Sequence, residues 1–228
     1  MSEGNMSVRE VSITPRKLGG FLTLPEKPEG LVLFAHGSGS SRFSPRNTMV
    51  ADRLNKARIA TLLFDLLTEQ ESRDRAKVFD IALLAARLSE VAAWARDENE
   101  ISQLPIGYFG ASTGAGAALV AASKEDVKIA AVVSRGGRPD LAPKEALNSV
   151  QAPTLLIVGS KDEDVMQLNR QALRELQCEA RLEIISGATH LFEETGTLER
   201  VSDSAAEWFI HHFRATTAMD NATLRKLL

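Results

Sequence analysis

The 228-residue sequence has little cysteine, no long apolar run and almost no excess charge. Cys178 is its only cysteine, which excludes an intramolecular disulfide and any zinc site built from several cysteines. No apolar stretch approaches the roughly 20 residues that cross a bilayer. The first residues, MSEGNMSVREVSITPRK, contain acidic side chains and no apolar core, so neither a secretory signal nor an anchor is expected. These absences predict a cytoplasmic protein without a membrane partner.

Charge and length narrow the class of protein further. Lys and Arg number 27 against 30 Asp and Glu, a net charge of −3, and no basic stripe is present that would match a phosphate backbone. We therefore expect no nucleic-acid partner. The length and the 44% hydrophobic composition favour a single domain over 1–215. The tail 216–228 is polar and then weakly amphipathic, which leaves open disorder, docking on a partner, or pairing into a homo-oligomer.

Short apolar runs alternate with helical patterns along most of the chain. The apolar runs predict strands buried on both faces at 31–35, 60–64, 106–109, 129–133, 154–158 and 182–185. Apolar residues at three- and four-residue spacing predict helices at 45–56, 77–96, 113–123, 165–176 and 198–213. This alternation is typical of the α/β class, with a mostly parallel sheet and helices on both faces. Segments 8–13 and 21–24 have no helix between them, so an antiparallel hairpin is expected at the N-terminus.

The stretch YFGASTGAGAAL contains a serine between a predicted strand and a predicted helix. Ser112 lies in the pattern Gly110-Ala111-Ser112-Thr113-Gly114, which is the G-x-S-x-G nucleophile elbow. Glycines flank the serine in this motif because side chains there would collide with backbone in a tight turn. Close packing of small residues would produce similar letters. A base and an acid at suitable later positions would favour the catalytic interpretation.

Such a base and acid follow the last two predicted strands. His190 lies in the loop GATH, and Asp162 lies in the loop VGSKD, with Glu163 and Asp164 as weaker alternatives. In an open α/β sheet these loops and Ser112 share the carboxyl edge of the sheet. A serine needs a histidine to remove its proton, and the histidine needs a carboxylate to orient it. The order Ser112, Asp162, His190 therefore predicts a catalytic triad.

The loop FAHGSGS is a candidate for the oxyanion hole. An oxyanion hole uses the backbone N–H after the nucleophile, here Thr113, and a second N–H from a loop after an earlier strand. Ser38, which follows a His-Gly pair, is the predicted second donor. His36 is expected to brace this loop through a side-chain hydrogen bond, with a role as catalytic base as the alternative.

Arginines are frequent in the loops predicted to surround the site. A guanidinium presents a fixed fork that matches carboxylate or phosphate, so Arg42 and Arg135 are predicted to bind a substrate that can be anionic. The alternative is that they pair with acids such as Asp65 or Asp140 and brace the loops. The segments 66–76 and 134–144 are too short for a large cap domain, which favours small substrates.

We expect no metal and no cofactor. Glu193 and Glu194 lie next to His190, but a second well-placed histidine is missing. These acids are expected to cap the following helix or to face solvent.

Five segments together resemble the α/β-hydrolase superfamily, within its dienelactone-hydrolase-like branch. They are LFAHGSGSSRFSPRN, YFGASTGAGAALVAA, VVSRGGRPDLA, APTLLIVGSKD and GATHLFEETGTLE, and the resemblance extends over about 31–213. It implies an α/β-hydrolase fold without a large cap and supports the same triad. Dienelactone hydrolases carry a cysteine nucleophile, whereas this chain has Ser112.

The predicted function is therefore a serine hydrolase that cleaves small soluble carboxylic esters or lactones through an acyl-enzyme. Thioesterase or acyltransferase chemistry is an alternative that the sequence leaves open. So is a non-catalytic ligand-binding or interaction module built on the same fold.

Overall fold

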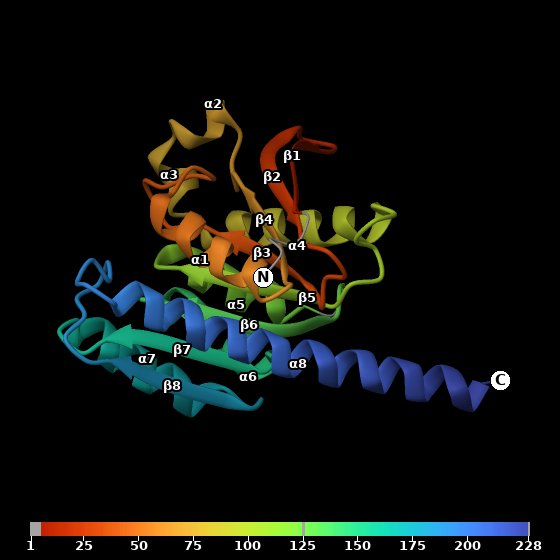
Figure 1. The fold of residues 1–228 in the computed structure, drawn as a ribbon. Coiled ribbons are helices and arrows are strands. Elements are labelled where there is room, and N and C mark those ends of the chain that lie inside the picture. Colours follow the sequence, from red (N-terminus) through yellow and green to blue (C-terminus); the bar gives the residue numbers. More distant parts are fainter. Residues whose placement is uncertain (1–5, 125, 228) are drawn as a thin grey trace.

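A twisted eight-stranded sheet forms the centre of the molecule in the computed structural model, which describes residues 6–124 and 126–227 (Figure 1). The strands lie in the order β1-β2-β4-β3-β5-β6-β7-β8. Their bounds are β1 Ser7–Ile13, β2 Leu18–Leu24, β3 Leu31–Ala35, β4 Ala60–Phe64, β5 Ile106–Ala111, β6 Ile129–Arg135, β7 Thr154–Gly159 and β8 Ala180–Ile185. All pairs from β4 to β8 are parallel, so their carboxyl ends meet at one edge.

The first two strands form the predicted antiparallel hairpin. β1 pairs with β2, and β2 pairs with β4 in the antiparallel sense. β1 is an edge strand and most of its residues are exposed, including the charged pair Arg9 and Glu10. Charges on an edge strand hinder pairing with another chain. The mostly parallel sheet and its N-terminal hairpin confirm the predicted α/β fold.

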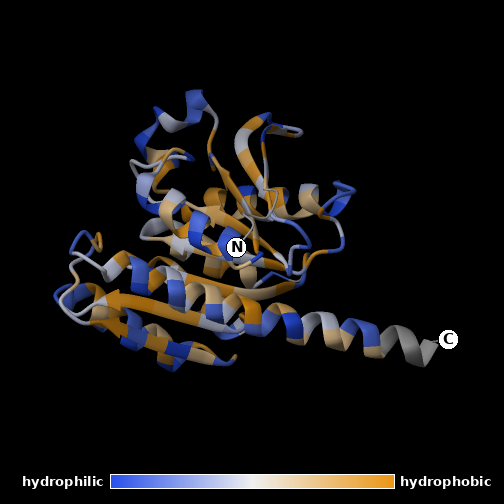
Figure 2. Ribbon diagram, in the orientation of Figure 1, coloured by the Kyte–Doolittle hydropathy of each residue, from blue (hydrophilic) through white to orange (hydrophobic). Residues whose placement is uncertain are grey.

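Helices cover both faces of the sheet. Their bounds are α1 Pro45–Lys56, α2 Glu69–Ser72, α3 Arg75–Val78, α4 Ile81–Asp97, α5 Thr113–Ala122, α6 Lys144–Ser149, α7 Glu163–Glu175 and α8 Thr197–Leu227, with a short 3-10 turn at Pro139–Leu141. α1 and α8 pack on one face, and α4 and α5 pack on the other (Figure 1). The central strands are hydrophobic throughout, while the helices are hydrophilic on their outer sides (Figure 2). Burial of strands on both faces explains the continuous apolar runs.

Aromatic rings of α8 sit directly against glycines of the sheet layer. A Cβ added at Gly107 would lie 2.6 Å from Cε1 of Phe209, and one added at Gly30 would lie 2.2 Å from Cδ2 of Phe213. The two rings stack with their centroids 5.5 Å apart and are fully buried. The missing side chains therefore let α8 approach the sheet closely.

Two predicted helices differ from the observed ones. The predicted helix 77–96 is divided, because α3 ends at Val78 and Asp80 caps a new helix, α4, by accepting a hydrogen bond from the Leu83 N–H at 3.0 Å. A capping aspartate starts a new helix where periodicity alone suggests continuation. The predicted helix 198–213 belongs to α8, which continues through the predicted tail as far as Leu227. Docking of that tail on a partner, one of the alternatives left open, stays a prediction.

Replacing Phe209 by alanine should lower the free energy of unfolding by about 3–5 kcal/mol, because the variant leaves a cavity in the layer between α8 and the sheet. Ile210→Ala, at the neighbouring and partly exposed position, should cost clearly less. Urea unfolding followed by circular dichroism measures both values. Equal losses in the two variants would contradict this account of the interface.

Candidate active site

The turn between β5 and α5 holds Ser112 in a strained backbone conformation. Its φ is 51° and its ψ is −121°, a region that residues with a side chain rarely adopt. A Cβ added at Gly110 would lie 2.4 Å from the Ala115 Cα, and one added at Gly114 would lie 2.1 Å from the Ala35 carbonyl oxygen. Neither position can carry a side chain without moving backbone. The G-x-S-x-G spacing is therefore a steric requirement of this turn.

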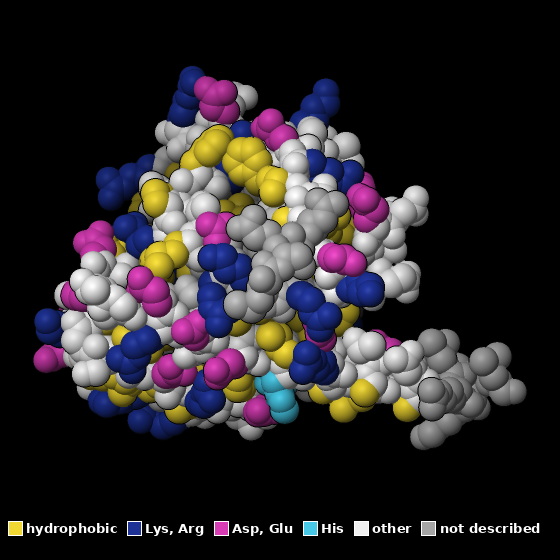
Figure 3. Space-filling model, viewed as in Figure 1, with side chains coloured by type: hydrophobic (Ala, Val, Ile, Leu, Met, Phe, Trp, Pro, Cys, Tyr) yellow, Lys and Arg dark blue, Asp and Glu magenta, His cyan; other side chains and the backbone are white. Residues whose placement is uncertain are grey.

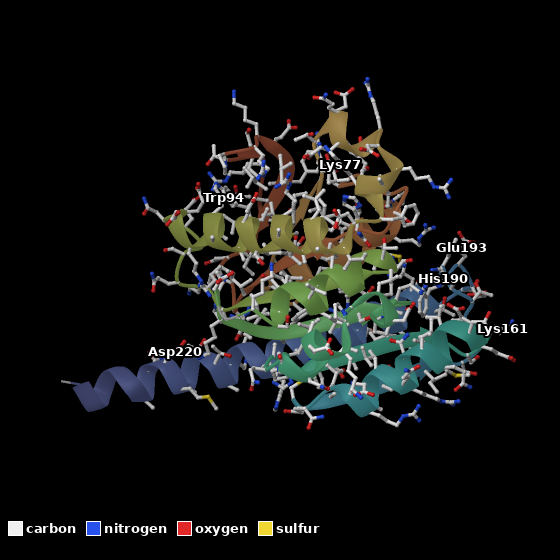
Figure 4. All side chains as sticks on the ribbon, turned by 180° about the vertical axis from the view of Figure 1, so that it is seen from behind. Lys77, Trp94, Lys161, His190, Glu193 and Asp220 are labelled. Atoms are coloured by element: carbon white, nitrogen blue, oxygen red, sulfur yellow. The ribbon has the colours of Figure 1, made fainter. Side chains whose placement is uncertain are left out.

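His190 and Asp162 contact each other directly at the carboxyl edge of the sheet. The distance between His190 Nδ1 and Asp162 Oδ2 is 2.6 Å, which is a short, charge-assisted type of hydrogen bond. With the proton on Nδ1, His190 donates to the carboxylate and keeps Nε2 free as an acceptor. The Asp162 side chain is 15% exposed and that of His190 is 38% exposed, so the imidazole is accessible. His190 and Glu193 lie at one end of the molecule, far from Asp220 on α8 (Figure 4).

Backbone contacts between two loops bring this pair together. The Lys161 N–H donates to the Ala188 carbonyl at 2.9 Å, and the Gly187 N–H donates to Ser160 Oγ at 2.9 Å. A Cβ added at Gly159 would lie 2.4 Å from the Ala188 carbonyl oxygen, so the loops approach closely only because β7 ends in glycine. The loop after β7 and the loop after β8 therefore behave as one unit.

The loop after β6 connects Ser112 to the region of His190. The Ser112 N–H donates to the Arg135 carbonyl at 3.2 Å, and the Arg138 N–H donates to the Ser112 carbonyl at 3.1 Å. In the same loop, a Cβ added at Gly136 would lie 3.5 Å from Cε1 of His190. The structure thus brings the three predicted residues to one edge. No hydrogen bond between the side chains of Ser112 and His190 is present among the described residues.

The loop after β3 lies beside Ser112, as predicted for an oxyanion hole. A Cβ added at Gly37 would lie 3.2 Å from the Ser112 Cβ. The Ser38 N–H donates to the Thr113 side-chain oxygen at 2.8 Å. Ser38, the predicted second donor, is thus near the Ser112 turn. Its N–H is bound by the Thr113 hydroxyl, and a change of the Thr113 rotamer would free it.

His36 braces this loop in its neutral form, as predicted. The Leu66 N–H donates to Nε2 of His36 at 3.2 Å, which leaves Nδ1 to donate to the Gly37 carbonyl at 3.0 Å. Burial lowers the pKa of His36 below its ordinary value, against smaller raising effects from the Gly37 carbonyl and from Asp65. With both ring nitrogens engaged, this imidazole ties the loop to the strand end at Leu66.

A cavity of about 990 Å³ opens beside the Ser38 loop. One wall comes from the short helices α2 and α3, and the opposite wall comes from the turn between β1 and β2. Its lining includes apolar residues Leu67, Val78 and Phe79 and basic residues Lys17 and Arg75. Over the face seen in Figure 3, acidic and basic side chains are mixed. The volume lies in the range of small-molecule sites.

The segment over 66–76 contributes more to the site than the sequence predicted. Thr68 and Glu71 form a capping box around α2, and Glu71 also accepts a hydrogen bond from Arg87 at 2.9 Å. Arg87 is only 4% exposed and holds Glu90 as well, at 3.3 Å. The Thr-x-x-Glu spacing is a signal for this helix that the sequence offered. Its anchoring on α4 needed the tertiary structure.

The arginines around the site differ in their partners. Arg42 pairs with Asp65 through its side chain and also donates its backbone N–H to Asp65 at 2.8 Å. Arg138 forms a bidentate pair with Asp140, with distances of 2.8 and 2.7 Å. These two therefore brace loops, which is the alternative considered for the arginines. Arg135 differs, because among the residues that the structure describes its side chain hydrogen-bonds only to the Asn47 side chain, at 3.4 Å.

Glu194 acts on the loop that carries His190. Both of its carboxylate oxygens accept from the Thr189 N–H, each at 3.1 Å, and its carbonyl accepts from the Thr197 N–H at 3.0 Å.

Across residues 6–124 and 126–227, no group of three or more His, Cys, Asp or Glu side chains is placed to hold a metal ion. Over the same ranges, no helix has both the length and the apolar character that crossing a bilayer needs.

The chain belongs to the α/β hydrolases. Residues 28–217 match the family described as "Alpha/beta hydrolase domain", and the strained turn between β5 and α5 carries the G-x-S-x-G pattern of this class. The chain is similar to the crystal structure of a dienelactone hydrolase from Anabaena variabilis. Identity is 51%, the alignment covers 92% of this chain and 99% of that one, and the TM-score is 0.86.

More distant structures share the fold, and curated relatives carry a different name. Est1E from Butyrivibrio proteoclasticus is 17% identical with a TM-score of 0.75, covering 91% of this chain and 99% of that one. Two Mycobacterium tuberculosis proteins, both named "Putative phosphoribosyl transferase", are 58% identical over 203 residues. That alignment covers 89% of this chain and 46% of each relative, so the chain spans about half of their length.

We expect the free energy of unfolding to fall as the pH drops below the ordinary histidine pKa of about 6.5. In that range the unfolded chain binds a proton at His36, whereas the folded protein keeps the ring neutral because its pKa is lowered. Burial lowers the pKa of His212 too, so His36→Gln should remove only part of the dependence. Denaturant titrations of both proteins between about pH 7 and 5 measure the difference. A constant difference over that range would show that His36 does not contribute.

Proposed function

We propose that this α/β hydrolase cleaves small carboxylic esters or lactones through an acyl-enzyme on Ser112. The observation that carries the proposal is the 2.6 Å hydrogen bond between His190 and Asp162 at the same sheet edge as the strained Ser112 turn. The bond orients the imidazole and stabilises the imidazolium that forms when the base takes a proton. The 51% identity to a dienelactone hydrolase supports hydrolysis of an ester-type bond.

The reaction would proceed in two halves. His190 Nε2 accepts the Ser112 proton as Oγ attacks the carbonyl carbon, and the imidazolium then protonates the leaving alcohol. A water molecule, deprotonated by His190, attacks the acyl-enzyme and releases the acid and the free serine. In a lactone the leaving alcohol stays attached to the acyl group, so the product is a single hydroxy acid.

The Thr113 and Ser38 N–H groups would stabilise the oxyanion in both halves. For Ser38 to do so, the Thr113 side chain must release the N–H that it accepts at 2.8 Å. Catalytic hydrogen bonds often reach their final geometry only with substrate bound. The cavity beside Ser38 would hold the larger part of the substrate.

The name of the mycobacterial relatives describes proteins of which the aligned part is 46%, and the proposed chemistry needs only the residues of the hydrolase domain. Thioesters pass through the same acyl-enzyme, and so does acyl transfer to an acceptor other than water. A substrate panel with oxygen esters, lactones and thioesters separates these reactions.

Ser112→Ala should abolish hydrolysis of short chromogenic acyl esters, because the variant has no nucleophile. Intact mass spectrometry after treatment with a serine-reactive phosphonate should show one adduct on the wild type and none on the variant. Ser123→Ala, at the far end of α5, is the matched control and should behave like wild type. Labelling of the Ser112→Ala protein would place the reactive serine elsewhere, and an inert wild type would favour a binding module.

Asp162→Asn should lower kcat by a factor on the order of a thousand or more, because the amide no longer holds the histidine tautomer that leaves Nε2 as an acceptor. The control is Asp164→Asn, a nearby exposed carboxylate on α7, which should leave kcat close to wild type. Steady-state kinetics on the best ester of the panel give both values. If Asp164→Asn caused the larger loss, the acid of the triad would have to be reassigned.

A further inference from the structure

Arg135 is a buried cation without a counterion. It is 7% exposed, its Nε has no hydrogen-bond partner, and within the described part of the chain no carboxylate pairs with it. Its one hydrogen bond, from Nη2 to the Asn47 side-chain oxygen, is long at 3.4 Å. Burying a guanidinium in this way is unfavourable unless a partner compensates the charge.

Other buried arginines of this chain show what a structural role requires. Arg87 is 4% exposed and is held by two carboxylates, Glu71 at 2.9 Å and Glu90 at 3.3 Å. Arg96, which is partly buried, donates to the Ser102 and Leu104 carbonyls at 2.8 and 2.7 Å. Arg87, like Arg135, has a buried Nε without a partner, but the Nη groups of these bracing arginines donate to protein acceptors at normal distances. Arg135 leaves most of its five N–H groups unused.

A second arginine strengthens the positive potential at the same place. Arg46 lies in the first turn of α1, and its Nε is also buried without a partner. Its contact with Glu193, at 3.3 Å, involves a carboxylate that is 64% exposed, and such a surface pair is weak. Burial and, second, the nearby Arg46 lower the pKa of Arg135 to about 10, so the Arg135 guanidinium stays charged at neutral pH. The first turn of α1 has no acidic residue to offset these two arginines.

This pair of cations adjoins the proposed catalytic residues. Arg135 is the last residue of β6, and its carbonyl accepts the Ser112 N–H. The next residue, Gly136, packs against the His190 ring and its carbonyl. Glu193, which contacts Arg46, lies in the loop that carries His190. Figure 4 shows the labelled side chains of Glu193 and His190 close together.

We propose that Arg135 and Arg46 form a subsite for an oxyanion, a carboxylate or a phosphate carried by the substrate next to the bond that is cleaved. The inference rests on the proposed function for the identity of the reacting bond, and on the unpaired guanidinium for the charge. A planar fork with free N–H groups matches both oxyanions. The ligand would supply the charge compensation that the protein itself lacks.

Three chromogenic esters with acyl groups of similar length test the preference. Their acyl groups end in a methyl group (butanoyl), a carboxylate (hemisuccinyl) or a phosphonate (3-phosphonopropanoyl). The wild type should cleave one or both charged esters with a kcat/KM higher than that of the butanoyl ester, on the order of tenfold to a hundredfold, as expected for charge-assisted hydrogen bonds. The better of the two charged groups identifies the oxyanion.

Arginine variants connect that preference to the subsite. Arg135→Met and Arg46→Gln should each reduce the ratio of charged to neutral ester toward one. Arg53→Gln, on the same helix but paired with Asp203 on the surface, should keep the wild-type ratio. A wild type that prefers the neutral ester, or an Arg135→Met protein with an unchanged ratio, would overturn the proposal.

A binding experiment without turnover separates this inference from the proposed function. The Ser112→Ala protein should gain thermal stability with inorganic phosphate or acetate at constant ionic strength, and the added Arg135→Met substitution should remove that gain. In buffer without these anions, Arg135→Met should be at least as stable as its parent, because an uncompensated buried charge is gone. If Ser112 proves unreactive while the anion effect depends on Arg135, the subsite stands without the hydrolase. Equal anion effects in the two proteins would refute it.

Discussion

The left-handed turn at Ser112 is the constraint on which the rest of the site depends. Holding a serine at φ 51° costs on the order of 1–3 kcal/mol, so surrounding structure must enforce it. The enforcement is steric: backbone fills the places where side chains of Gly110 and Gly114 would lie. The backbone groups of Ser112 then hold its neighbours: its N–H donates to the last residue of β6, and its carbonyl accepts from the loop that follows. One tight turn therefore fixes the positions of several loops.

The two sides of Ser112 offer different properties to a ligand. On the side of α2 and α3 lies the cavity of about 990 Å³, and there Arg42 is paired with Asp65. On the side of α1 and the His190 loop lies the uncompensated positive charge of Arg135. A protein selected only for stability would replace such a charge or pair it, as it does at Arg87. Under the two proposals, the shape of the substrate would be recognised on the side of α2 and α3, and its charge on the side of α1.

Much of the fold could be predicted from the sequence, because buried parallel strands give continuous apolar runs with turn residues at both ends. β3 and β4 match their predicted bounds, whereas β5, β6 and β7 extend further to Ala111, Arg135 and Gly159. These extra residues lie at the functional edge, where hydrogen bonding continues after hydropathy has changed. The family and the contact between Asp162 and His190 could also be predicted from the sequence, because loops that follow neighbouring parallel strands lie close together at one edge of the sheet. The partners of the arginines could not be predicted from the sequence, because any of the 30 acidic residues could pair with them. Only packing shows that Arg42 has one and Arg135 does not.

The helix α8 begins seven residues after His190 and continues as one element from Thr197 to Leu227. Its 31 residues correspond to a rod of roughly 45 Å, and in Figure 1 its last turns project beyond the sheet. Any group attached at that end would be held at a set distance and direction from the carboxyl edge of the sheet, unlike a group on a flexible tether, whose reach varies with chain statistics. The helix is therefore both a cover for the sheet and a rigid extension that starts close to the loop that carries His190.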